Sequence, residues 1–116
     1  MQNATRGTLI GNAIDCAETS AARRVGLLNH SGLEEGAGLW IVPCESVHTF
    51  FMKFCIDLVY IDRRHCVRSV VRRLAPWRLS MCLAAHSILE LPGGTIDRTN
   101  TQKGDQLVLE AISINQ

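Results

Sequence analysis

The sequence lacks any apolar run long enough to cross a membrane. Runs such as "LVYI" and "LWIVPC" stay far below the ~18 residues that a spanning helix requires. The N-terminal stretch "MQNATRGTLIGNAID" also lacks a basic segment followed by an apolar one, so we expect no signal peptide. These absences predict a cytoplasmic protein with no membrane partner.

Closely spaced cysteine pairs are also missing. The five cysteines include no C-x-x-C pair, although a disulfide framework or a structural zinc site normally shows closer pairing. Each cysteine lies within or beside an apolar segment, so we expect free, mostly buried thiols that behave as small hydrophobes. One reactive thiol is the alternative. The cysteines are Cys16, Cys44, Cys55, Cys66 and Cys82.

The signatures of common enzymes are absent as well. There is no nucleophile elbow, no recognisable pair of carboxylates and no glycine-rich phosphate loop. The histidines (His30, His48, His65 and His86) are isolated, and without an H-x-H motif a cupin-like metal centre is not expected. The sequence therefore predicts neither a cofactor nor a metal ion.

What the sequence does contain suits one compact domain over residues 1–116, since 47% of the residues are hydrophobic and 20% are charged. Strand-like segments follow one another from residue 7 to residue 114, and 19–30 is the one good helix candidate. Because no helices alternate with the strands, we expect a mostly antiparallel β-sandwich or barrel rather than a parallel βαβ architecture.

Residues 45–62, "ESVHTFFMKFCIDLVYID", raise the question of function. A continuous strand over 47–61 would be about three times the usual length, so we expect a break near Lys53–Cys55. Such a bend would let Lys53 and Asp57 approach each other or a common ligand, with His48 at the start of the first strand. The structural alternative, which the pattern alone favours, is an exposed lysine, a backbone-capping aspartate and a locally hydrogen-bonded histidine.

Positive charge is concentrated between residues 62 and 78, where Asp62 is the only acid. Such a stripe could bind nucleic acid or an acidic partner. Protection of an exposed strand edge is the interpretation we favour, since aromatic residues do not alternate regularly with the charges, and we expect no nucleic-acid partner. The residues are Arg63, Arg64, Arg68, Arg72, Arg73 and Arg78.

Several motifs occur in a recognisable order along the chain. They are R-x-G-L-L from Arg24, G-x-G-L from Gly36, "HTFFMKF-x-ID", "LELPGG" and "KGD" from Lys103. Together they resemble the uncharacterised prokaryotic family known as domain of unknown function 192, over about residues 8–114. The resemblance implies a β-sandwich of jelly-roll character with a helix near one edge.

No catalytic residue can be carried over from this family, because none is settled for it. Some positions depart from its pattern: His30 stands where arginine is usual, Cys55 where proline is common, and "RRHC" replaces a glycine-containing turn. The positions that match its signature are Arg24, Gly26, Leu27, Pro43, His48, Phe50, Met52, Asp57, Glu90, Leu91, Pro92, Gly94, Gly104 and Asp105.

The function expected from these observations is a non-catalytic module that binds a small molecule or a protein through a polar cluster on the β-fold. We expect His48, Asp57 and Glu90 to converge in one solvent-open depression, with Lys53 or Arg24 at its rim. One alternative is a small hydrolase-like enzyme that uses His48 with Asp57. Another is a module whose basic face binds an anionic partner. The sequence leaves the oligomeric state open.

Overall fold

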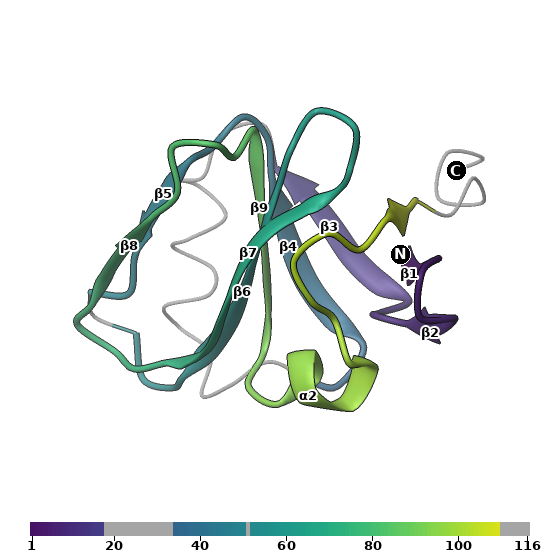
Figure 1. The fold of residues 1–116 in the computed structure, drawn as a ribbon. Helices are drawn as coiled ribbons and strands as arrows, with labels where there is room; N and C mark the ends of the chain where they lie inside the picture. The colour runs from purple at the N-terminus through teal and green to yellow at the C-terminus, as the bar shows by residue number, and fades with distance from the viewer. Residues whose placement is uncertain (18–33, 51, 110–116) are drawn as a thin grey trace.

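The computed structural model describes residues 1–17, 34–50 and 52–109, and the fold is mostly β, as the strand pattern predicts. Five strands of the described chain form a central sheet in the order β3-β4-β9-β6-β7 (Figure 1). They are β3 (Ala13–Ala17), β4 (Ala37–Ile41), β6 (Ile56–Ile61), β7 (Val67–Leu74) and β9 (Ser87–Pro92).

The middle strands of this sheet, β6 and β9, are buried on both faces. Their sequences, "IDLVYI" and "SILELP", are almost continuously apolar, which is typical of strands covered on both sides. Side chains alternate between the two faces, so each strand contributes to two separate hydrophobic clusters. Asp57 on β6 and Glu90 on β9 are the charged residues in these strands, and both are fully buried.

A two-stranded ribbon covers one face of the central sheet. It pairs β5 (Ser46–His48) with β8 (Leu79–Met81) in antiparallel fashion, and Figure 1 shows it to one side of the central strands. Val47 of the ribbon packs with Leu58 and Ile88 of the sheet in the first hydrophobic cluster. The inner side of the ribbon is therefore part of the core.

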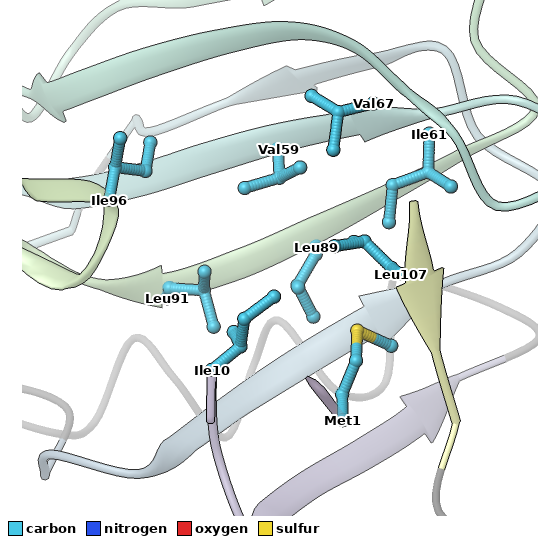
Figure 2. Close-up of a cluster of buried hydrophobic side chains, with 9 residues drawn as sticks. All are labelled: Met1, Ile10, Val59, Ile61, Val67, Leu89, Leu91, Ile96 and Leu107. Atoms are coloured by element: carbon cyan, nitrogen blue, oxygen red, sulfur yellow. The ribbon is translucent and has the colours of Figure 1, made fainter. Parts of the chain in front are cut away.

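The opposite face of the sheet is covered by a small sheet and a short helix. The small sheet has the order β10-β1-β2 in the described chain, and the helix is α2 (Thr95–Thr99). Figure 2 shows the second cluster, in which Leu107 of β10, Ile96 of α2, and Met1 and Ile10 next to β1 and β2 meet apolar side chains of the central sheet. The strands of the small sheet are β1 (Gln2–Asn3), β2 (Thr8–Leu9) and β10 (Leu107–Val108).

The structure confirms the predicted break in the long apolar stretch. β5 ends at His48 and β6 begins at Ile56, with bends at Lys53 and Phe54 between them. The strand segments predicted on either side of Gly11, at 39–42, at 66–74 and at 87–94 are also present.

Other expectations were wrong or concern residues that the structure does not describe. β3 and β4 pair in parallel, which we did not predict, and the connection between them is long enough for such a crossover. The predicted helix at 19–30 lies outside the described residues, whereas α2 was not predicted. The cysteines are free, as expected, but they are not mostly buried, since Cys16 and Cys55 are exposed and the other three are half-buried.

No helix within the described residues combines the length and the apolar character needed to cross a membrane.

Candidate functional site

The Asp57 carboxylate closes a turn in the fold rather than lining a depression. One oxygen accepts the Arg73 amide at 2.8 Å, and the other accepts the Gly94 and Ile96 amides at 3.1 and 2.8 Å. Gly94 precedes α2 with φ of 98°, a left-handed conformation that glycine adopts without a steric penalty. Asp57 thus ties β6 to β7 and to the start of α2, which is the structural alternative that the sequence favoured.

Glu90 lies on the other face of the central sheet. In the β6–β9 register Asp57 stands opposite Leu91 of the second cluster, whereas Glu90 stands opposite Leu58 of the first cluster. Side chains of directly paired residues share a face, so the two carboxylates point in opposite directions. The prediction that His48, Asp57 and Glu90 converge in one open depression was therefore wrong.

The remaining candidates of that set are separate from both carboxylates. Lys53 is exposed in the bend after Met52, and Arg24 lies outside the described residues. His48 is exposed on β5, where its neighbour Val47 points into the first cluster, so the imidazole is on the outer face of the ribbon. A His48–Asp57 pair for catalysis is not assembled, because the ribbon and the sheet lie between the two side chains.

The outer face of the ribbon carries large apolar side chains next to His48. His48 is the direct cross-strand neighbour of Leu79, and Met81 follows on the same face two residues further along β8. Beyond the end of the ribbon, the ring centroids of His48 and Phe50 are 4.9 Å apart and those of Phe50 and Trp77 are 5.8 Å apart. We call these five residues the ribbon surface.

The exposure of this surface is unusual for side chains of this kind. Trp77 is 55% exposed, Leu79 67% and Met81 59%. Single exposed apolar residues are common in folded proteins, but a contiguous group marks an interaction surface. The contacts between successive members make the ribbon surface such a group.

Thr49 fixes the turn that carries Trp77. Its hydroxyl donates to the Ala75 carbonyl at 2.6 Å and accepts the Arg78 amide at 2.8 Å. Its backbone also bonds to this turn, because the Thr49 amide donates to the Arg78 carbonyl and the Trp77 amide donates to the Thr49 carbonyl. Thr49 is fully buried, so its hydroxyl makes these bonds out of contact with water.

Trp77 itself has φ of 64°, a left-handed conformation that is unfavourable for a bulky residue. Such strain persists only where the surrounding structure enforces it, and the bonds to Thr49 do so here. The Arg78 guanidinium donates to the Trp77 backbone carbonyl at 3.3 Å, so a cation lies on the same turn. The turn therefore presents an aromatic ring and a positive charge together.

The ribbon is attached to the central sheet by a polar contact in addition to its core packing. The Tyr60 hydroxyl on β6 hydrogen-bonds to the Ser80 hydroxyl on the inner side of β8. Burial raises the pKa of Tyr60, and the nearby Cys82, Cys44 and Glu90 act in the same direction, whereas the bond to Ser80 lowers it. Tyr60 therefore stays a neutral hydrogen-bonding group over the physiological range.

The six arginines do not form a single patch. Arg63 and Arg64 lie at the β6–β7 turn, beside a shallow hollow of about 390 Å³ that His86 also lines. At the far end of β7, Asp97 pairs with Arg72 at 2.7 Å and with Arg73 at 3.7 Å. β7 is an edge strand of the central sheet, which agrees with the interpretation that these charges protect an edge.

Asp62 at the same turn accepts the backbone amides of Arg64 and Cys66. Burial raises the pKa of this carboxyl, but these bonds and the neighbouring arginines outweigh it, so its pKa is below the usual value.

No group of three His, Cys, Asp or Glu side chains that could hold a metal ion occurs in the described part of the chain.

The "KGD" motif has a structural role. The Asp105 carboxylate is buried and accepts the Asn3 side-chain amide at 2.9 Å, the Arg6 guanidinium at 3.1 Å and the Gln102 backbone amide at 2.9 Å. Burial raises the pKa of Asp105, but the combined bonds outweigh it and hold the pKa below the usual value. Gly104 before it has φ of 95° and forms the turn.

Asp105→Asn is expected to lower the free energy of unfolding by about 1–3 kcal/mol at pH 7, because a neutral amide oxygen accepts the bonds from Asn3, Arg6 and Gln102 more weakly than the carboxylate does. A carboxyl with a lowered pKa in the folded state stabilises the protein above its unfolded pKa of about 3.9 and stops doing so as the pH falls through the folded value. Urea unfolding at pH 7, 5, 4 and 3 should show the two proteins converging below about pH 4. The control Asp97→Asn, at an exposed position, should not show this convergence; a constant difference at every pH would contradict the assignment.

Sequence reasoning missed most of the ribbon surface. His48 was a candidate, but Phe50, Trp77, Leu79 and Met81 were not, and the segment "APWRLSMCLA" was interpreted as starting in a loop. The available signal was the alternation in "LSM", where a polar residue lies between two apolar ones. That pattern predicts a strand, but it suggests that the apolar side faces inward.

The comparisons with known proteins agree on a family and a fold. The model of domain of unknown function 192, described as an uncharacterized ACR, matches residues 1–109. A UPF0127 protein from Thermococcus sibiricus is 32% identical over 111 residues, covering 90% of this chain and 71% of that protein.

Solved structures resemble the fold at low sequence identity. A protein of unknown function from Novosphingobium aromaticivorans superimposes with a TM-score of 0.72 at 18% identity, covering 83% of this chain and 74% of that one. A putative transcription regulator from Sinorhizobium meliloti gives 0.71 at 18% identity, covering 80% and 78%. The match over nearly the whole chain shows that this protein belongs to the uncharacterised family of domain of unknown function 192.

Proposed function

We propose that the protein is a single-domain, non-catalytic binding module that recognises an apolar segment of a partner protein through the ribbon surface. The observation that carries this proposal is the exposure of Trp77, Leu79 and Met81 on one face of the ribbon, in continuity with Phe50 and His48.

The composition of the ribbon surface suits a protein partner. Tryptophan, phenylalanine, methionine and arginine are enriched where proteins bind one another, whereas lysine and glutamate are depleted. Tryptophan and arginine dominate the residues whose truncation costs most affinity. The sequence "WRLSM" at 77–81 places both of them beside a leucine and a methionine.

The rigidity of the turn supports the same role. Binding is weakened by the entropy lost when mobile side chains and loops become ordered. Here the hydrogen bonds to Thr49 fix the backbone of Trp77 before any partner arrives, and the stacking on Phe50 restricts its ring. A partner that covers the indole would therefore order little additional structure.

The charge of Arg78 on the same turn specifies the partner further. The Arg78 guanidinium bonds to the carbonyls of Pro76 and Trp77, and both of those are neutral acceptors. An acidic side chain in the partner would add a charge-assisted bond at this position. We therefore favour a segment with apolar side chains next to an aspartate or glutamate.

A hydrolase that uses His48 and Asp57 has less support. Both Asp57 oxygens accept backbone amides in the interior of the fold, so the carboxylate is committed to structure. Binding of an anionic partner over the whole basic segment also has less support, because Asp97 pairs with Arg72 and Arg73.

A cytoplasmic location is part of the proposal, and the five free cysteines suit a reducing compartment.

The test is selection from a display library of random peptides with immobilised protein. We expect the selected peptides to combine apolar residues with an acidic one, and to shift the tryptophan fluorescence to shorter wavelength as Trp77 leaves water. Trp77→Gly should weaken binding of the best peptide at least about tenfold, a typical loss for an aromatic residue at the centre of an interface. Glycine suits the left-handed backbone at this position, so the turn should keep its shape.

A matched control is available on another face of the molecule. Leu9 on β2 is 46% exposed and lies outside the ribbon, so Leu9→Ser should leave peptide binding unchanged. Peptides that bind wild-type protein and Trp77→Gly with equal affinity, or a selection that enriches no peptide, would overturn the proposal.

A further inference from the structure

Among the described residues, β8 has one edge with which no strand pairs, as its hydrogen bonds to β5 show. The Thr49 amide donates to the Arg78 carbonyl just beyond the end of the ribbon. In an antiparallel pair, hydrogen-bonded and non-hydrogen-bonded positions alternate, so Val47 and Ser80 form the next hydrogen-bonded pair. The residues on either side of Ser80 therefore direct their amides and carbonyls away from β5.

These outward-facing residues are Leu79 and Met81. Within the described residues, β8 pairs only with β5, and no hydrogen bond joins the backbone of Leu79 or Met81 to another element. Proteins usually protect such an edge with charged side chains, as β7 does with its arginines. β8 carries no charge along its length, so no charged side chain of this strand opposes pairing with another strand.

The edge is self-complementary about Ser80. If β8 of a second copy runs antiparallel with Ser80 opposite Ser80, then Leu79 of each copy faces Met81 of the other as a hydrogen-bonded pair. The outward amides and carbonyls of Leu79 and Met81 then all have hydrogen-bond partners. The apolar side chain of Leu79 lies next to that of Met81 from the other copy. We propose that two copies of this chain pair through the edges of their β8 strands in this register.

Charge complementarity supports a second copy rather than an unrelated strand. Arg78 precedes β8 at one end, while Glu45 lies at the other end, where the Cys82 amide donates to its carbonyl. A two-fold axis through Ser80 brings Arg78 of each copy to the end that holds Glu45 of the other. Residues of opposite charge thus lie at the same end of the paired strands, with one strand between them, which favours this pairing.

The pairing would extend the ribbon into the four-stranded order β5-β8-β8-β5 across the two copies. Leu79 and Met81 of the two copies would then adjoin on one outer face, so each copy contributes residues to a continuous apolar surface. The inference concerns the edge of β8 and stands apart from the proposed function, which uses its face and which a monomer could perform.

Sedimentation equilibrium over a wide concentration range tests the pairing. Wild-type protein should form dimers, and Met81→Pro should raise the dissociation constant at least about tenfold, because proline removes an edge donor on each copy. Its ring is compatible with the fold, since this amide makes no bond to β5 and Ser80 before it is extended. Met81→Ala keeps the donor and should weaken the dimer less; a wild-type protein that stays monomeric throughout would overturn the proposal.

Disulfide trapping tests the register, and it remains decisive if Met81→Pro fails to fold. Leu79→Cys and Met81→Cys proteins, mixed and mildly oxidised, should form a covalent dimer through the two introduced cysteines, identified by peptide mapping. Hydrogen-bonded neighbours lie about 5.5 Å apart between Cα atoms, within disulfide range. Leu79→Cys alone should not cross-link through its new cysteine, since the two copies of that position are offset along the strands; equal cross-linking alone and in the mixture would contradict the register.

Discussion

Asp57→Ala is expected to lower the free energy of unfolding by about 3–5 kcal/mol, because each of three backbone donors loses its acceptor at about 1–3 kcal/mol. The donors are the amides of Arg73, Gly94 and Ile96, and the Asp57 side chain that accepts them is fully buried. The loss is less than the largest possible sum, since Arg73 and Gly94 lie where water can reach the freed amides. Urea unfolding at pH 7, followed by circular dichroism, measures the change.

Two variants locate the cause of this loss. Asp57→Asn keeps one acceptor oxygen and should fall between wild type and Asp57→Ala. Asp97→Ala removes an exposed carboxylate that pairs with Arg72, and should change stability by no more than about 0.5 kcal/mol. An Asp57→Ala protein that unfolds at the wild-type urea concentration would show that the carboxylate is not needed for the fold, and would reopen its role in binding.

The sequence left both possible roles of Asp57 open, although the pattern alone favoured the structural one. The break before β6 was predictable, because no ordinary strand is as long as the apolar stretch. The partners of the carboxylate were not predictable, since Gly94 and Ile96 are 37 and 39 residues away along the chain. Only the pairing of β6 with β9 brings the turn after β9 to the side chain.

Asp57 and Glu90 do not converge as predicted because of the register in which β6 and β9 pair. Both residues lie on neighbouring strands, but a shift of one residue in the pairing moves a side chain to the opposite face. Because β6 and β9 are apolar on both faces, their sequences do not specify which residues stand opposite one another. The two strands were therefore easier to predict than the side on which each carboxylate lies.

Several signature positions of the family turn out to hold the fold together. A Cβ atom on Gly38 would lie 2.8 Å from the Glu90 carbonyl oxygen, so the close approach of β4 to β9 requires glycine. Gly94 and Gly104 adopt left-handed conformations at turns, and Asp105 is a buried acceptor. The resemblance could predict a β fold because many of its motifs specify turns and strand contacts.

The ribbon surface could not be predicted, because it departs from the usual pattern of a strand that covers a core. A pattern of alternating residues predicts a strand with its apolar side inward, and at β8 that rule is inverted, since Ser80 faces the core and Leu79 and Met81 face solvent. Places where a local rule fails without a gain in packing are often functional sites. That inversion is the reason for assigning binding to this face.

Thr49→Val is expected to affect both the fold and the proposed binding. Valine has nearly the shape of threonine, but without the hydroxyl the Ala75 carbonyl and the Arg78 amide lose their bonds. We expect a loss of about 2–3 kcal/mol in the free energy of unfolding, since each unsatisfied group costs about 1–3 kcal/mol and the freed groups regain part of this from water. The same urea titration measures it.

The effect on binding follows from the strain in the turn. With the hydroxyl gone, fewer bonds hold Trp77 in its left-handed conformation, and the turn can relax toward a more favourable backbone. A partner must then restore the original geometry at its own cost in binding energy, so the selected peptide should bind Thr49→Val more weakly than wild type. The matched control is Thr49→Ser, which keeps the hydroxyl and should retain peptide affinity despite losing a buried methyl group. If Thr49→Val binds the peptide as tightly as Thr49→Ser does, the turn is not what positions Trp77, and the rigidity of the ribbon surface has another source.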